Sequence, residues 1–153
     1  MRRLFGLLLA GTIMLLPALS QNHGTAHAQD ALTFNGDMAL LSIAIKPGQT
    51  AQFEQIMAKV REALTTSSNP QRKQQASGWK VFKSATAMPD GNIVYTHVIN
   101  PVVRGTDYTI MAILYEAFTD PAEQTELFEM YRDAFGANLG GSAGTVAVDL
   151  SRP

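Results

Sequence analysis

The sequence predicts a single α+β domain in which helices cover one face of an antiparallel sheet. Three observations support this prediction. They are an apolar, β-rich run at 38–46, a helical repeat of apolar residues between 53 and 64, and a turn signal at 89–92 between two further strands. In chain order the expected elements read β-α-β-β-α-β, with short extra helical turns. This order is the split β-α-β arrangement of α+β domains.

The first 28 residues have the features of an export signal. A short basic start and an uncharged run at 4–16 lead to the small-x-small pattern Ala-His-Ala. We expect cleavage after Ala28, so that the mature chain starts at Gln29, with cleavage after Ser20 as the weaker alternative. The apolar run is short for a membrane span, so we expect a periplasmic or secreted protein with no membrane attachment after cleavage. The paired arginines leave the twin-arginine route open, but the long Leu-rich run favours the general secretory route.

The mature chain would keep 125 of the 153 residues, which suits one hydrophobic core. It would contain ten basic and thirteen acidic residues, a net charge of about −3. A mildly acidic chain lacks the basic surface that nucleic acid requires, so no nucleic-acid partner is expected. Cysteine is absent, which excludes disulfides, thiolate metal sites and iron–sulfur clusters.

The first strand is expected at 38–46, where both faces are apolar. A strand of this kind is usually central in its sheet or covered on both sides. The period then becomes helical over 53–64, with Thr50 as the expected N-cap. Pro70 ends this helix, and residues 71–76 have room for one further helical turn.

A β-hairpin is predicted next, with strands at 79–85 and 93–99 joined by the Pro-Asp-Gly-Asn turn at 89–92. The segment 108–118 has no alternation of apolar and polar residues and is long for a strand. We therefore expect it to form a largely buried helix, capped by Asp107.

The last helix has the clearest start in the chain. Asp120 is the expected N-cap, a proline takes the first helical position, and Glu123 completes a capping box. Gly136 is the expected end of this helix. A glycine-rich loop at 139–144 and a short final strand at 145–150 are expected to follow.

The predicted order is the ferredoxin-like arrangement, with the domain at 38–153 behind a flexible polar leader at 29–37. In a monomer of this kind one face of the sheet has no helices on it. Because the first strand is apolar on both sides, we expect a homodimer in which the sheets of two copies cover each other.

Three blocks of the mature chain carry a resemblance to other proteins: LSIAIKPG at 41–48, GWKVFK at 78–83 and DYT at 107–109. They resemble a group of uncharacterised exported bacterial proteins, over nearly the whole mature chain, and this resemblance implies no activity. In topology the chain is similar to the dimeric α+β barrel superfamily, which includes cofactor-free antibiotic-biosynthesis monooxygenases and haem-degrading enzymes. That likeness implies a dimeric barrel, but function does not follow from fold alone.

His97 is the only histidine in the expected mature chain, and it shares a strand face with Tyr95 and Ile99. One interpretation makes it an acid/base group or a single haem or metal ligand. The favoured interpretation is a partly buried histidine that is hydrogen-bonded to a neighbour, because a lone histidine is a poor metal site. The haem-degrading enzymes place their histidine on a helix, so that role is not transferred to His97.

Trp79, Tyr95 and Tyr108 are the candidate walls of a ligand pocket, together with His97. Each aromatic residue also fits a purely structural role, and for Trp79 a core position is favoured. Arg104 is a candidate orienting residue for a carboxylate or another anion. The basic residues near the second strand fit a solvated surface better than an anion site.

No complete catalytic or metal-binding motif occurs in the sequence. The glycine-rich stretch lacks the Lys-Ser/Thr of a P-loop, and neither a nucleophile elbow nor a His-Glu-x-x-His motif is present. We therefore expect no cofactor. The preferred function is a binding or interaction module for an apolar small molecule or a protein. The alternative is a cofactor-independent monooxygenase or haem-handling enzyme, with His97 as acid/base group beside Trp79 and Tyr95.

Overall fold

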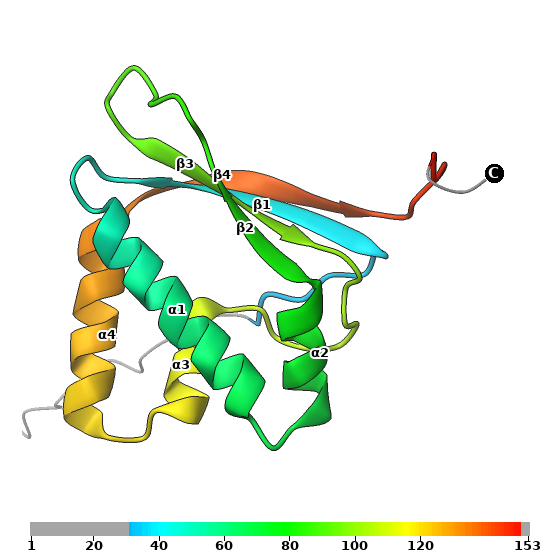
Figure 1. Ribbon diagram of the computed structural model, residues 1–153, viewed down its shortest axis with the longest axis horizontal. Helices are drawn as coiled ribbons and strands as arrows, with labels where there is room; N and C mark the ends of the chain where they lie inside the picture. The colour runs from blue at the N-terminus through cyan, green and yellow to red at the C-terminus, as the bar shows by residue number, and fades with distance from the viewer. Residues whose placement is uncertain (1–30, 151–153) are drawn as a thin grey trace, which may run out of the picture.

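The computed structural model describes residues 31–150 and places four strands and four helices in this part of the chain (Figure 1). The expected export signal and its cleavage site lie outside the described residues. No helix in the described range is long and apolar enough to cross a membrane. The elements in chain order are β1 (Met38–Ile45), α1 (Thr50–Thr66), α2 (Pro70–Gly78), β2 (Trp79–Lys83), β3 (Ile93–Ile99), α3 (Ile110–Ala117), α4 (Pro121–Ala134) and β4 (Phe135–Gly144).

The strands form one antiparallel sheet in the order β2-β3-β1-β4. β1 is central, as its two apolar faces predict. The helices pack on one side of this sheet, which confirms the α+β class (Figure 1). In the β1–β3 pair, Leu41 lies opposite His97 and Ile43 lies opposite Tyr95. These four side chains share the helix-covered face, because directly paired residues point to the same side of a sheet.

The β2–β3 hairpin is confirmed, with a longer connection than the sequence predicts. β2 ends at Lys83, two residues before the expected end. In the turn, the Gly91 N–H donates to the Met88 carbonyl at 2.8 Å, and the Met88 N–H donates to the Asn92 carbonyl at 2.8 Å. Gly91 has φ +83°, a conformation that glycine adopts without steric cost.

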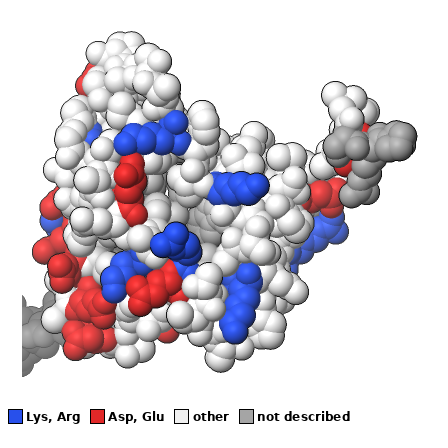
Figure 2. All heavy atoms as spheres, in the orientation of Figure 1, with Lys and Arg blue, Asp and Glu red and all other residues white. Residues whose placement is uncertain are grey.

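Ion pairs join the helix layer to the sheet and the helices to each other. The Lys83 ammonium at the end of β2 lies 2.8 Å from the Glu54 carboxylate of α1, and Lys59 of α1 lies 3.4 Å from Glu123 of α4. Figure 2 shows basic and acidic side chains interspersed on this face of the molecule. Pairs as exposed as these contribute about 0–1 kcal/mol each, so packing must supply most of the stability.

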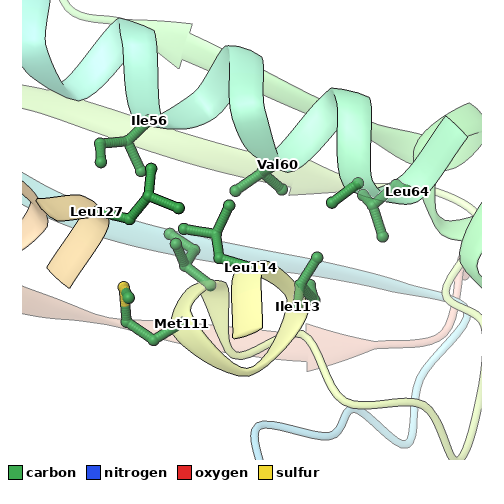
Figure 3. Packing of buried hydrophobic residues seen from close by; sticks show 9 residues of the cluster. Ile56, Val60, Leu64, Met111, Ile113, Leu114 and Leu127 are labelled. Atoms are coloured by element: carbon green, nitrogen blue, oxygen red, sulfur yellow. The ribbon is translucent and has the colours of Figure 1, made fainter. Parts of the chain in front are cut away.

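Apolar side chains of three helices form the larger part of the core (Figure 3). The buried α1 residues Ile56, Val60 and Leu64 follow the helical repeat seen in the sequence. They pack against Leu114 of α3 and Leu127 of α4. All five are at most 4% exposed, so truncating any one of them to alanine is expected to cost about 2–5 kcal/mol.

The helix starts agree with the sequence in part. Asp120 caps α4 as predicted, and its Oδ1 accepts two backbone N–H groups of the first turn at 2.9 and 3.0 Å. Thr50 is the first residue of α1 instead of its cap, and Gln49 precedes it without a side-chain capping bond. Helix α3 starts at Ile110, so Asp107 lies too far upstream to be its cap residue.

The C-terminal part differs from the expectation. Helix α4 is followed directly by β4, so Gly136 lies within a strand and does not end a helix. The stretch 139–144 belongs to β4 and is not a loop, whereas 145–150 lies outside the sheet. Glycine suggests a loop in the sequence, but here it permits close pairing: a Cβ on Gly141 would collide with the Leu40 carbonyl oxygen of β1.

Residues 31–37, expected to lie outside the fold as a flexible leader, pack along the domain and are called the N-terminal strap below. Phe34 is 9% exposed, and its ring centroid lies 5.3 Å from that of Tyr108. The Leu32 N–H donates to Asp107 Oδ1 at 2.9 Å and to Thr109 Oγ1 at 3.2 Å. The Leu32 carbonyl accepts the Tyr108 N–H at 2.8 Å, so both backbone groups of Leu32 are bound.

Candidate ligand cavity

A cavity of about 220 Å³ lies between the helix-covered face of the sheet and the segments that cross it. The strap, all four strands, α3 with the residues before it, and α4 each contribute to its wall. Most of the wall is aliphatic or aromatic, and its polar side chains besides Trp79 and the two tyrosines are His97, Thr109 and Asn138. No Asp, Glu, Lys or Arg lines it among the described residues.

A larger groove of about 790 Å³ runs between α1 and α4, but it has a different character. Exposed charged side chains, including Lys59, Glu62 and Glu126, form much of its lining. None of the described side chains there has a buried polar atom without a partner. We therefore place the candidate site in the smaller cavity, where such an atom is present.

His97 is the central polar residue of the cavity. It lies on β3 and is 0% exposed. The indole N–H of Trp79 donates to His97 Nδ1 at 3.0 Å. The β2–β3 register produces this contact, because Trp79 pairs with Ile99 and so lies diagonal to His97 on the same face. Burial lowers the pKa of His97 from 6.5 to about 4, since desolvation disfavours the imidazolium, and the side chain is neutral at pH 7.

The contact with Trp79 determines which imidazole nitrogen carries the proton. An indole N–H can only donate, so Nδ1 of His97 must accept, and the proton of the neutral ring lies on Nε2. His97 Nε2 has no hydrogen-bond partner within the described chain. The ring of Phe53 lies 6.3 Å away between centroids, and an aromatic ring offers an N–H group only a weak contact. A buried donor left in this state costs about 1–3 kcal/mol, which an acceptor brought by a ligand would recover.

Aromatic rings form much of the cavity wall. Trp79 packs against Tyr108 with centroids 5.4 Å apart and an interplanar angle of 64°, and against His97 at 5.6 Å. Tyr131 and Phe135 meet at 5.7 Å on the α4–β4 side. Burial raises the pKa of Tyr131, so its phenol stays protonated near neutral pH. The cavity wall is therefore uncharged on this side and consists largely of aromatic rings.

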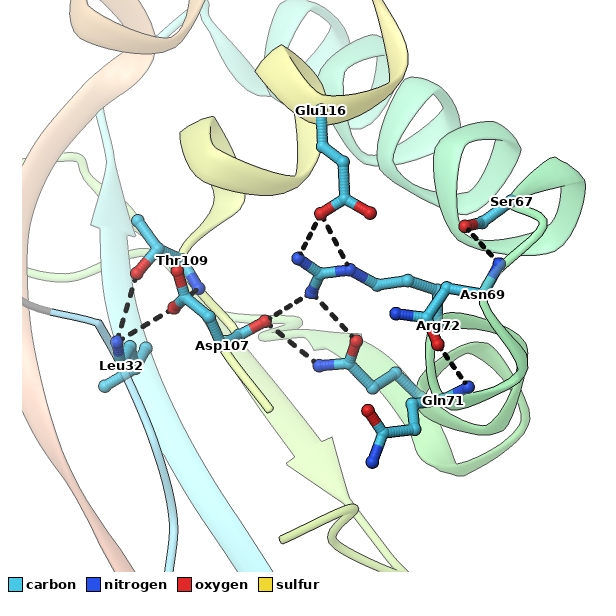
Figure 4. Close-up of polar contacts among 9 residues, drawn as sticks. Leu32, Ser67, Asn69, Gln71, Arg72, Asp107, Thr109 and Glu116 are labelled. Atoms are coloured by element: carbon cyan, nitrogen blue, oxygen red, sulfur yellow. Dashed lines mark hydrogen bonds and ion pairs between the residues drawn. The ribbon is translucent and has the colours of Figure 1, made fainter. Parts of the chain in front are cut away.

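A chain of polar contacts holds two parts of the wall in place (Figure 4). Arg72 of α2 forms an ion pair with Glu116 of α3 and donates to the Asp107 carbonyl at 2.7 Å. Gln75, which is 0% exposed, donates to the same carbonyl at 3.1 Å. Because the Asp107 carboxylate binds the Leu32 N–H, these contacts connect α2 to the strap. Arg72 thus has structural partners and only 12% of its side chain is exposed, whereas the sequence favours a solvated surface for the basic residues near the second strand.

Three of the candidate residues named from the sequence meet at the cavity. Trp79, His97 and Tyr108 all line it. The Tyr108 hydroxyl accepts the Val103 N–H at 2.9 Å, so the ring of Tyr108 is the part available to the cavity wall. The remaining candidates, Tyr95 and Arg104, do not line this cavity.

Tyr95 and Arg104 have partners elsewhere. The Tyr95 hydroxyl donates to Glu54 Oε1 at 2.6 Å, and hydrogen bonds from Lys83 and Tyr95 lower the pKa of the Glu54 carboxyl. Arg104 pairs with Asp37 of the strap at 2.8 Å, and its side chain is 65% exposed. The structural partner of Arg104 is thus an acidic residue of the strap.

Sequence reasoning missed several wall residues. Leu32 was assigned to a leader, although its alternation with Phe34 is the signal that this segment packs on a surface. The sequence places Tyr131 and Phe135 on one apolar face of the expected last helix, whereas Phe135 is the first residue of β4. Asn138 lies between the expected helix end at Gly136 and the expected loop at 139–144, because the sequence does not predict β4 at its observed position.

The described residues contain no group of three or more His, Asp or Glu side chains placed to hold a metal ion. The wall offers a ligand a mostly apolar enclosure with a few hydrogen-bonding groups, among which His97 Nε2 is fully buried and has no partner within the described chain. Comparisons with known protein families, with curated proteins and with solved structures find no match to this chain. Its function must therefore be inferred from the geometry of the cavity.

Proposed function

We propose that the protein is an exported binding module whose cavity holds one small apolar molecule, with His97 as the polar contact. The observation that carries this proposal is the buried Nε2–H of His97, which has no partner within the described chain although it belongs to a cavity wall. Buried polar groups are nearly always paired in folded proteins, and an exception points to an additional binding partner. Apolar walls with few polar groups are typical of small-molecule sites.

The protonation and hydrogen bonding of His97 favour a role in ligand binding over a role in acid/base catalysis. A general base needs an imidazole lone pair that can reach a substrate proton. The lone pair of His97 lies on Nδ1, where the Trp79 N–H occupies it at 3.0 Å. A general acid needs an imidazolium, and burial lowers the pKa of His97 to about 4. The same occupied lone pair disfavours His97 as a haem or metal ligand, because ligation uses a nitrogen without a proton.

We further propose that the domain has the ferredoxin-like arrangement and forms a homodimer through the open face of its sheet. The strand order β2-β3-β1-β4, with helices between β1 and β2 and between β3 and β4, supports the fold. The open face bears Leu40 at 38% and Phe82 at 63% exposure. Its central hydroxyls, Ser42 and Thr96, bond each other at 2.9 Å, so a second copy could cover this face without leaving them unpaired.

Native mass spectrometry of the protein purified from its own extracytoplasmic compartment tests these proposals together. We expect a dimer in which each subunit carries the mass of a small molecule, and a denatured chain that starts at Gln29. A ligand-free dimer that also takes up no added small ring compound would contradict the binding proposal. A monomer at micromolar concentration would contradict the homodimer, and an uncleaved chain would contradict export through the signal.

A variant with a filled cavity tests where the molecule is bound, and the same substitution at an exposed position is its matched control. Leu41 points into the cavity from β1, so Leu41→Phe should reduce the bound mass. Leu150→Phe makes the same change at a residue that is 94% exposed, and it should leave the bound mass unaltered. Equal loss in both variants would mean that the molecule is bound elsewhere.

A further inference from the structure

We infer that the cavity selects neutral ring compounds that carry a hydrogen-bond acceptor, such as an aryl ketone, and that Trp79 sets this selectivity by keeping His97 a donor. This inference rests on the proposed binding function and specifies the ligand class of the same site. Its steps come from the volume, the charge and the hydrogen-bonding groups of the cavity.

The volume of the cavity suits a single ring with a small substituent. The space is about 220 Å³, and an apolar protein cavity of about 150 Å³ is known to accept benzene. The difference leaves room for roughly two or three more non-hydrogen atoms. The rings of Trp79, Tyr108 and Phe135 present edges and faces to this space, and such surfaces pack well against a flat aromatic partner.

The electrostatics of the cavity exclude charged ligands. None of its described wall residues is an Asp, Glu, Lys or Arg, and Tyr131 and His97 are both neutral at pH 7. An ionic ligand would lose its hydration and gain no counter-ion in return. A carboxylate is therefore a poor ligand here, even though it is a good hydrogen-bond acceptor.

Two other polar wall groups accept hydrogen bonds within the chain. Thr109 Oγ1 accepts the Leu32 N–H at 3.2 Å, and Asn138 Oδ1 accepts the Gly140 N–H at 2.8 Å. His97 Nε2–H is the fully buried polar group that lacks a partner among the described residues. A ligand that complements this wall brings an acceptor, and a carbonyl oxygen next to a ring fits both the size and the polarity.

Trp79 acts as a positioning residue because it fixes the tautomer of His97. Without the indole N–H, the imidazole proton is free to move to Nδ1, which leaves a lone pair on Nε2. Trp79→Phe removes this donor and keeps an aromatic ring at the wall. The variant should therefore show a weaker preference for an acceptor, although it keeps an apolar cavity.

Three probes of nearly equal shape test the inference: acetophenone, α-methylstyrene and benzoate. They present a ketone oxygen, a methylene group and a charged carboxylate at the same position on the ring. Isothermal titration of the wild-type protein should show acetophenone binding about tenfold more tightly than α-methylstyrene, or about 1.4 kcal/mol, with benzoate weakest. In Trp79→Phe the ratio of the two neutral affinities should fall below the wild-type ratio, because part of the imidazole population then carries its proton on Nδ1 and must move it to Nε2 to bind an acceptor. Comparing this ratio within each protein cancels the change in cavity volume.

Nitrogen-15 NMR of His97 gives a second measurement that needs no variant. The wild-type ring should show a proton on Nε2 and none on Nδ1, and addition of acetophenone should shift the Nε2–H resonance. Equal affinity for acetophenone and α-methylstyrene, tight benzoate binding, or a proton on Nδ1 would overturn the inference and leave the binding proposal standing. Failure of all three probes to bind would overturn the binding proposal itself.

Discussion

Mild acid should destabilise the folded protein through His97. The pKa of this side chain is about 4 in the folded protein because it is buried, against an ordinary value of 6.5 that applies to the unfolded chain. Between these values the unfolded chain binds a proton that the folded protein does not. The free energy of unfolding must then fall as the pH falls through this window, and it is unaffected by His97 above it. For these two pKa values, linkage gives a loss of about 2 kcal/mol between pH 7 and pH 5.

The assay is urea denaturation at pH 7, 6 and 5 of the wild-type protein and of His97→Gln. Glutamine keeps an acceptor for the Trp79 N–H but does not titrate. Carboxylates also titrate in acid, and Glu54, with its lowered pKa, loses stabilising contacts as the pH falls. Because both proteins retain these carboxylates, the difference between their pH profiles reports His97 alone.

The wild-type protein should lose about 2 kcal/mol more than His97→Gln over this range. Parallel pH profiles would refute the reasoning, since they would mean that His97 titrates alike in the folded and unfolded chains. If the variant does not fold, an NMR titration of wild-type His97 decides the question. A pKa at or above 6.5 in that titration contradicts the proposed neutral, buried donor.

Three further predictions concern the fold and its assembly. Asp120→Ala should lower the free energy of unfolding by about 1 kcal/mol in urea denaturation, because two N–H groups of α4 lose their acceptor, whereas Asp120→Asn should retain most of it. Gly141→Ala should cost about 1–3 kcal/mol because its Cβ meets the Leu40 carbonyl of β1. Gly144→Ala has open space and should be nearly neutral, so equal costs would argue against the β1–β4 pairing. Leu40→Lys should convert the proposed homodimer to monomer in analytical ultracentrifugation, Leu150→Lys should not, and a Leu40→Lys dimer would exclude the open face as the interface.

The elements that the sequence predicts well are those with strong local signals. The first strand, the Pro-Asp-Gly-Asn turn and the Asp120 cap depend on neighbours within a few residues, and all three occur as predicted. β4 was missed because its signal is not local. Its glycines suit close contact with β1, which is about 100 residues earlier in the chain.

In the candidate site, too, the features that depend on local sequence were predicted and those that depend on distant contacts were not. The alternation of residues along the predicted strands was enough to identify Trp79 and His97 as candidate site residues. Tyr108 was predicted as part of a pocket wall, and it lines the cavity. The hydrogen bond that fixes the His97 tautomer depends on the register of β2 against β3. That register is set by the length and geometry of the turn, which ends β2 two residues earlier than the sequence suggests. The sequence therefore predicts that Trp79 and His97 belong to the site, but it does not predict the hydrogen bond between them or the tautomer of His97.

The N-terminal strap bears on how fast a ligand can exchange. It closes part of the cavity with Leu32, whose N–H is held by side chains 75 and 77 residues away in the chain, at the rim of the domain. Contacts of this kind open in local fluctuations that leave the core strands and helices folded. A bound molecule can then leave by release of the strap alone, at a rate far above that of global unfolding. Residence time and stability become separate properties in this domain, because the Asp107 and Phe34 contacts of the strap govern the first and the helix–sheet core governs the second.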